Sequence, residues 1–145
     1  MRKEILSYEL IVYKGVRVTS GALPLNQAGK ALREIRDNYP EMYKKVRSII
    51  KQVAEDDTGQ LFRELKKSSK ISKLTNAAGN DDLYEAKHPV KRKKGSGGVV
   101  RVYFAFSKQA KPDQMVLLDA EYKTGDPDYS AAVSRLQEYR SSDDK

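Results

Sequence analysis

The sequence predicts an α+β fold, in which a small antiparallel or mixed β-sheet is accompanied by an N-terminal helical hairpin and a C-terminal helix. Apolar residues alternate with period two in four segments, which is typical of strands, and recur at three- and four-residue steps in others, which is typical of amphipathic helices. The order along the chain is strand, helical hairpin, three sequential strands and helix, without an internal repeat. This order favours a sheet with its helices packed on one face.

The N-terminal half begins with the segment Ile5–Val18, whose alternation predicts a strand, with Gly15 as a candidate turn. A helical apolar stripe follows from Leu25 to Tyr39, and a proline ends it. Because proline fits the first turn of a helix, a second stripe from Met42 to Val53 predicts the other, antiparallel arm of a hairpin. A shorter helical piece is predicted from Leu61 to Leu65.

The C-terminal half contains three further segments of strand composition, namely Leu83–His88, Val99–Phe106 and Met115–Lys123. Asp126 and Pro127 then supply the N-cap and first-turn proline of a closing helix. A chain of this length has the size of one ordinary domain. We therefore expect residues 1–145 to form a single domain, with residues 141–145 as a disordered tail.

Composition excludes several classes of protein. The chain has 145 residues, with 28 Lys and Arg against 20 Asp and Glu, and its formal net charge of +8 favours a polyanionic partner, either nucleic acid or an acidic protein. The absence of cysteine and the single histidine, His88, argue against a disulfide framework, a thiol nucleophile, a His-based metal site and a Ser-His-Asp triad. No segment approaches the roughly 18 apolar residues of a membrane span, and no signal peptide is recognisable. We expect a cytoplasmic protein with no membrane partner.

Strand alternation sorts the side chains of the last three strands between the two faces of the sheet. In the middle strand the even-numbered positions are strongly apolar, which leaves Arg101 on the face away from the core. In the last strand the even-numbered positions are again the apolar set, so Val116 and Leu118 are expected in the core and Lys123 opposite. Lys87, in the first of these strands, is predicted on the same face as Arg101 and Lys123. The three cations are thus predicted on the side of the sheet that the helices leave uncovered.

This cationic face has two interpretations. Cations fixed on a rigid sheet can hold a phosphodiester and stabilise the charge that develops during its cleavage. Alternatively, the face is simply solvated, and Asp119 and Glu121 are ordinary cross-strand partners of the cations. Surface ion pairs are common, so the alternation by itself favours the second interpretation.

Two further features are ambiguous in the same way. The basic run Lys91, Arg92, Lys93 and Lys94, together with the adjacent His88, is a candidate contact for an RNA backbone, or else a solvated loop tip beside the glycine-rich segment that follows. Tyr129 is predicted in the first turn of the closing helix, where anions are favoured, but its spacing also fits the apolar stripe of that helix.

Several segments, taken together and in order, resemble the RelE/HigB-like toxins of the RelE/ParE superfamily, which belong to type II toxin–antitoxin modules. The resemblance covers roughly residues 73–140, and the predicted helical hairpin lies where that family has one. No single motif in it is highly specific, and the ordered set is more persuasive than any piece. The matching segments are Lys73-Leu74, Leu83–Lys87, Val100–Phe106, Val116–Thr124 and the closing helix.

The resemblance implies an mRNA endonuclease that acts on ribosome-bound transcripts and is neutralised by a cognate antitoxin. In such enzymes the 2′-hydroxyl attacks the adjacent phosphate to give a 2′,3′-cyclic phosphate, without a metal or other cofactor. By the resemblance, Arg101 and Lys123 stabilise the pentacoordinate phosphorane, Lys87 assists loss of the hydroxyl proton, and Tyr129 orients the nucleophile or acts as base. Glu85 departs from the family, where a second lysine stands, and Lys123 replaces an arginine that could bind phosphate through two nitrogens.

Two other functions are compatible with these segments. A toxin of the related ParE type shares the fold but poisons gyrase by binding, without cleaving RNA. A plain RNA- or DNA-binding module would use the same basic residues and would be harmless when overexpressed.

Overall fold

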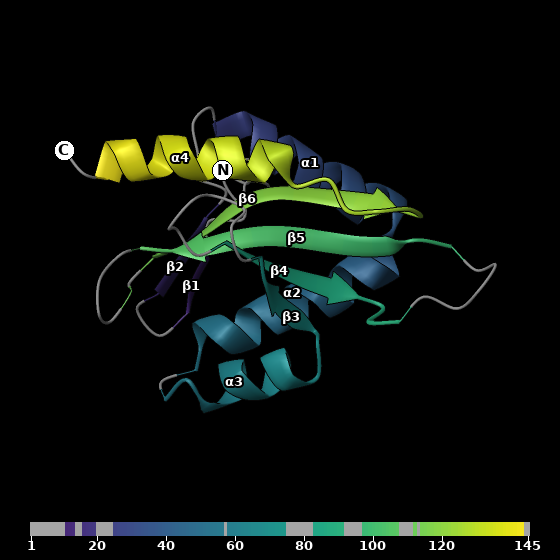
Figure 1. Ribbon diagram of the computed structural model, residues 1–145, viewed down its shortest axis with the longest axis horizontal. Helices are drawn as coiled ribbons and strands as arrows, with labels where there is room; N and C mark the ends of the chain where they lie inside the picture. Colours follow the sequence, from purple (N-terminus) through teal and green to yellow (C-terminus); the bar gives the residue numbers. More distant parts are fainter. Residues whose placement is uncertain are drawn as a thin grey trace.

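The computed structural model describes residues 11–13, 16–19, 25–56, 58–74, 83–91, 97–107, 112 and 114–143. These residues form an α+β structure around a six-stranded sheet with strand order β1-β2-β6-β5-β4-β3 (Figure 1). This arrangement confirms the α+β class and the mixed sheet. The strands are β1 (Ile11–Tyr13), β2 (Val16–Thr19), β3 (Ile71–Lys73), β4 (Tyr84–His88), β5 (Val99–Phe106) and β6 (Gln114–Lys123).

The centre of the sheet is the antiparallel set β4-β5-β6, whose three strands lie close to the predicted segments. The N-terminal segment was predicted as a strand with a candidate turn at Gly15, which lies outside the described residues. The described part is an antiparallel pair, β1 and β2, and β2 runs parallel to β6. The prediction had no strand at β3, which pairs antiparallel with the edge of β4. Only three residues long, β3 is too short to show a period-two pattern.

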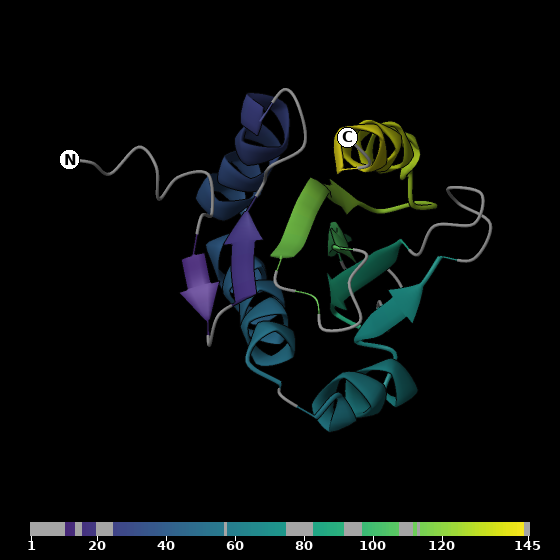
Figure 2. The same cartoon turned by 90° about the vertical axis from the view of Figure 1, so that its left-hand side faces the viewer.

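Three helices cover one face of the sheet. They are α1 (Leu25–Asn38), α2 (Pro40–Ala54) and α3 (Gln60–Lys67). Tyr39 alone links α1 to α2, and the two helices form a V-shaped hairpin in Figure 1, with α2 beginning at Pro40 as predicted. Figure 2 shows α1 and α2 behind the short strands β1 and β2.

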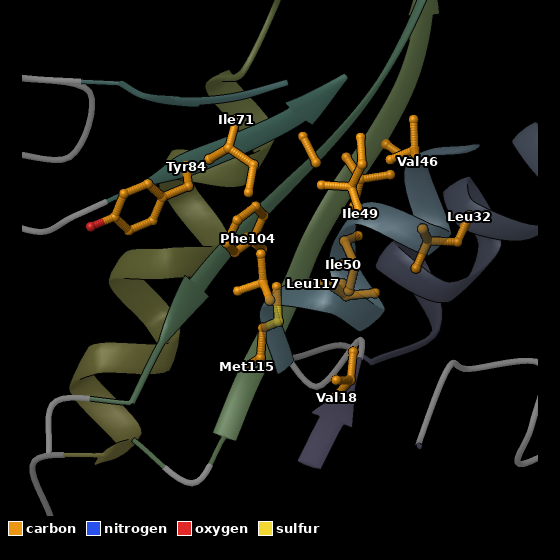
Figure 3. Packing of buried hydrophobic residues seen from close by; sticks show 14 of the residues in the cluster. Val18, Leu32, Val46, Ile49, Ile50, Ile71, Tyr84, Phe104, Met115 and Leu117 are labelled. Carbon is orange, nitrogen blue, oxygen red and sulfur yellow. The ribbon is translucent and has the colours of Figure 1, made fainter. Parts of the chain in front are cut away.

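The main core fills the space between these helices and the sheet. Figure 3 shows Ile49 and Ile50 of α2 packed with Phe104 of β5 and Leu117 of β6. The even-numbered residues of β5 from Val100 to Phe104 belong to this core, which confirms their predicted face. Burying such aliphatic and aromatic side chains is the main favourable contribution to folding.

The fourth helix, α4 (Ser130–Asp143), packs on the opposite face, so the prediction that all helices lie on one face was wrong. Ala132 and Leu136 of α4 are fully buried against Tyr103 and Ala105 of β5 in a second, smaller core. The odd-numbered positions of β5 therefore also meet a hydrophobic layer, although alternation had assigned them to an uncovered face.

Both predicted ends of α4 need correction. The helix begins at Ser130, so Tyr129, predicted in its first turn, precedes it. Asp128 Oδ1 accepts hydrogen bonds from the backbone N–H and the hydroxyl of Ser130, so Asp128 and not Asp126 satisfies a free N-terminal N–H. The helix also continues to Asp143, into the segment predicted as a disordered tail, of which residues 144 and 145 lie outside the described residues.

A β-bulge in β6 explains the wrong assignment of two core residues. Tyr103 pairs with Asp119, but the next residue, Phe104, pairs with Leu117, so Leu118 is inserted without a partner. The insertion reverses the alternation on one side of the bulge. Val116 and Leu118 consequently pack under α4 instead of in the main core, where Leu117 takes their place.

Arg135 of α4 holds this bulge. Its Nη1 donates to the carbonyl of Leu118 at 2.7 Å and to Oδ1 of Asp119 at 3.2 Å. Burial raises the pKa of the Asp119 carboxyl, against the lowering effect of Arg135. The ion pair therefore compensates a carboxylate that is only 16% exposed.

We expect Arg135→Met to lower the free energy of unfolding by about 2–3 kcal/mol, because it leaves a buried carboxylate and a bulge carbonyl without their donor. The loss should be larger at pH 7 than at pH 4, since a carboxyl with a raised pKa is least unfavourable to the fold when it is protonated. Urea denaturation measures both values. The matched control is Arg63→Met, on the exposed side of α3, and equal losses in the two variants would contradict this role.

Candidate functional site

Five polar side chains lie together on the α4 face of the sheet, beyond the start of α4. The register places Lys87 directly opposite Arg101, Glu85 opposite Tyr103, and Arg101 opposite Glu121. Opposite residues of antiparallel strands have neighbouring side chains on the same face. We call Glu85, Lys87, Arg101, Tyr103 and Glu121 the charged cluster.

The middle of the charged cluster is a carboxylate between two cations. Glu85 Oε1 lies 3.8 Å from Lys87 Nζ and 3.7 Å from Arg101 Nε. The three side chains are only 5%, 19% and 12% exposed, respectively. Because charges rarely enter a protein interior unless they are paired, this mutual compensation explains how β4 and β5 can bring them there.

Pairing in the cluster is nevertheless incomplete. Arg101 Nε and Nη1 and Glu85 Oε2 are buried and have no hydrogen-bond partner among the described residues. Leaving a buried donor or acceptor unpaired costs about 1–3 kcal/mol, and more for charged groups. A guanidinium is the kind of group that binds the oxygens of a phosphate or carboxylate ligand.

The protonation of Glu85 is altered by its surroundings. Burial raises the pKa of this carboxyl above its ordinary value, and the nearby Glu121 raises it further. Arg101 and Lys87 oppose the rise without cancelling it. A carboxylate with a raised pKa is a better proton acceptor than an ordinary surface glutamate, which suits a general base.

Tyr103 and Glu121 connect the cluster to the segment before α4. The hydroxyl of Tyr103 donates to Glu121 Oε2 at 2.8 Å, and burial together with this bond raises the pKa of the phenol, which stays neutral. The backbone N–H of Asp128 donates to the same carboxylate oxygen at 3.2 Å. The ring of Tyr129 lies against that of Tyr103, with 6.1 Å between their centroids.

Lys123 lies at the rim of the charged cluster. It ends β6 opposite Val99, and its charge contributes to the lowered pKa of Asp128, whose main cause is the hydrogen bond from the Ser130 backbone. Gly98 allows the chain to pass this point, because a Cβ there would collide with the carbonyl of Lys123.

The four predicted catalytic residues are therefore distributed unevenly. Lys87 and Arg101 are adjacent in the cluster, whereas Lys123 and Tyr129 lie at its margin. The sheet face that was predicted to be uncovered is partly covered by α4, but α4 runs away from the charged cluster. Its successive contacts reach Leu118 from Arg135 and Phe106 from Arg140, toward the other end of the strands.

The predicted RNA-binding residues are not part of this cluster. His88 alternates to the other face of β4 and lies in a cleft beside α2. Lys91 is exposed, and Arg92, Lys93 and Lys94 lie outside the described residues.

Sequence reasoning missed Glu85, Tyr103 and Glu121 as members of the site. Their strand parity, shared with Arg101 and Lys87, was the available signal. Parity does not show burial, however, and it is the burial of Glu85 and Tyr103 that distinguishes this cluster from an ordinary solvated face.

No protein-family model matches the chain, and no curated protein or solved structure is significantly similar to it. Within the described ranges, no three His, Asp or Glu side chains gather closely enough to hold a metal ion. No helix in the same ranges is long and apolar enough to cross a membrane.

Proposed function

We propose that the charged cluster is the centre of an endoribonuclease site, and that the chain is the toxin of a type II toxin–antitoxin module. The main observation is the pairing of Glu85, whose pKa is raised, with Arg101, whose buried donors are unfilled. A proton acceptor beside a phosphate-binding guanidinium is the combination that attack of a 2′-hydroxyl on its own phosphodiester needs. The resemblance of residues 73–140 to RelE/HigB-like toxins supports the same reaction.

The reaction begins when Glu85 takes the proton of the 2′-hydroxyl. The freed oxygen forms a bond to the adjacent phosphorus, and the bond from phosphorus to the 5′-oxygen of the next nucleotide breaks. The 5′-oxygen leaves with a proton from solvent, so the products are a 2′,3′-cyclic phosphate and a 5′-hydroxyl. Arg101 donates to the non-bridging oxygens, whose negative charge grows as the phosphorane forms.

The other predicted residues have supporting roles. Lys87, 3.8 Å from Glu85, favours its ionised form and so keeps it able to accept the proton. Lys123 at the rim adds positive charge toward the phosphorane. Tyr129 orients the nucleotide that provides the 2′-hydroxyl, because its ring is held against Tyr103.

We expect Tyr129→Phe to lower the cleavage rate about tenfold, which corresponds to the loss of one neutral hydrogen bond of about 1.4 kcal/mol. The fold should be unaffected, since the ring and its contact with Tyr103 remain. Single-turnover cleavage of an RNA oligonucleotide measures the rate. The control is Tyr139→Phe, in α4, whose hydroxyl bonds to Gln114 at the far end of β6, and it should retain the wild-type rate.

Expression in bacterial cells with mapping of transcript 5′ ends tests the proposal as a whole. We expect growth arrest together with new 5′ ends inside translated messages, and rescue by a small acidic protein encoded beside the toxin. Growth arrest with intact messages and damaged DNA would overturn the endoribonuclease and favour the ParE-type, gyrase-binding alternative. Harmless overexpression would leave only a nucleic-acid-binding module.

A further inference from the structure

A second basic region lies on the other side of β4. It is a cleft of about 500 Å³ between α2 and the ends of β3 and β4. Its volume is in the range of pockets that bind small ligands or single nucleotides. Its polar lining includes Lys44, Lys45, Ser48, Lys70, Lys87 and His88.

Positive charge in the cleft is only partly compensated. Glu41, also in the lining, lies 4.0 Å from Lys44, but both side chains are largely exposed, and such a pair is weak. Lys45 and Lys70 have no ion-pair partner within the part of the chain that the structure describes. Burial is the largest cause of the lowered pKa of His88, and the positive charges of Lys45 and Lys70 lower it further.

Backbone geometry holds the two sides of the cleft in place. The N–H of Lys87 donates to the carbonyl of Lys70 at 3.0 Å, which fixes the β3 side against β4. Ile49 of α2, also in the lining, is buried in the main core, so the helix side is anchored as well. Lys44 and Lys45 therefore lie on α2 and Lys87 on β4, while Lys70 directly precedes β3 and is tied to β4 by this hydrogen bond.

We propose that this cleft binds backbone phosphates of the same RNA strand whose scissile phosphate occupies the charged cluster. This inference rests on the proposed function for the identity of the strand. Lys87 connects the two regions, because it lines the cleft and also pairs with Glu85. An RNA strand that leaves the cluster past Lys87, near the end of β4, would enter the cleft.

The lining favours a phosphate backbone over an acidic peptide. A bound peptide helix or strand needs apolar pockets for alternate side chains or an open sheet edge. The cleft offers few apolar side chains beside its lysines, namely Ile49 and Val90, and the edge of β4 is occupied by β3. Phosphates need only charge and hydrogen-bond donors, which Lys45, Ser48 and Lys70 supply.

The pKa of His88 should change when a phosphate binds in the cleft. A bound phosphate would offset Lys45 and Lys70, so the imidazole would gain a proton more easily and its pKa would rise. The groups that face it are Lys44, Lys45 and Glu41 on α2, Lys70 before β3, and Lys87 on β4. Because binding takes up a proton, affinity should increase as pH falls from 7.5 to 5.5. His88 is the single histidine of the chain, so its ring signals in NMR need no assignment.

The test uses a short single-stranded RNA with 2′-O-methyl groups, which the proposed chemistry does not cleave. We expect this RNA to raise the pKa of His88 in the full chain. The double substitution Lys45→Gln with Lys70→Gln should abolish that rise and reduce the slope of log affinity against log salt by about 1.4, or about 0.7 for each lost phosphate contact. The control pair, Lys51→Gln with Lys67→Gln, changes two exposed lysines of α2 and α3 outside the cleft and should retain the pKa rise.

The outcomes separate this inference from the proposed function. The assignment of the cleft as a phosphate-binding site would be overturned by an unchanged His88 pKa in the presence of bound RNA, or by equal slopes of log affinity against log salt for the two double variants. Either result would overturn it even if the chain cleaves RNA. A larger pKa rise with polyglutamate than with RNA would overturn the phosphate assignment in favour of an acidic protein. If no RNA is cleaved but the expected pKa rise and slope are found, the cleft stands as a nucleic-acid site and the endoribonuclease fails.

Discussion

Replacing Arg101 by lysine should lower the rate of RNA cleavage about 10²–10³-fold, the usual effect of removing one preorganised donor from a transition-state site. Lysine retains the positive charge beside Glu85 but not the planar group that offers several donors at once. Single-turnover cleavage by Arg101→Lys and by the wild type measures the effect. If cleavage depends on the geometry of the guanidinium, its charge alone will not restore the rate.

The control for Arg101→Lys is Arg63→Lys, an exposed arginine of α3 outside the charged cluster. Thermal unfolding of both variants shows whether the fold is retained. A rate within twofold of wild type for a folded Arg101→Lys would contradict the assignment of Arg101, because a structural ion pair with Glu85 needs only a cation.

Glu85→Gln should lower the cleavage rate about 10²–10⁴-fold, as expected for the loss of a general base. The same change should leave the free energy of unfolding at pH 7 equal or higher. A folded-state pKa above the unfolded value means that the ionised form is disfavoured by folding, so the contribution of this carboxyl is most favourable below its unfolded pKa and is lost as pH rises through the folded pKa. Glutamine resembles the protonated form at every pH.

Urea denaturation of wild type and Glu85→Gln at pH 4 and pH 7.5 measures the stability part of this prediction. We expect the wild type to lose stability relative to the variant as pH rises. The cleavage rate of the wild type should rise over the same interval, as Glu85 becomes able to accept a proton. A variant that is inactive because it unfolds would contradict the account, whereas an inactive variant of equal or greater stability supports it.

The sequence predicts the faces of the side chains better in β5 than in β6. Alternation in β5 correctly separates Arg101 from Val100 and Val102, because one strand of eight residues has a strict period of two. Alternation in β6 fails at Leu118, since a bulge adds one residue and no turn or glycine marks it. The positions after the bulge, including Lys123, still lie on the predicted face only because β6 pairs with β5 in register at that end.

Long-range packing limits the rest of the prediction. The apolar stripe of α4 is visible in the sequence, but the face of the sheet that it covers depends on the turn between Lys123 and Ser130. The sequence does not show that α4 lies on the same face as Arg101, nor that Glu85, Lys87 and Arg101 are largely buried, with Glu85 between the two cations. The cleft beside His88 could not be predicted either, because it lies between α2 and β4, which are separated by 29 residues of chain.

Product analysis of a single cleaved RNA tests the proposed endoribonuclease most directly. The purified chain is incubated with ribosome-bound message and with free RNA, and the ends of the fragments are identified. We expect a 2′,3′-cyclic phosphate and a 5′-hydroxyl, and no cleavage when the 2′-hydroxyl at the cut position is methylated. Fragments with 5′-phosphates, cleavage of the methylated substrate, or intact RNA in both preparations would contradict the account.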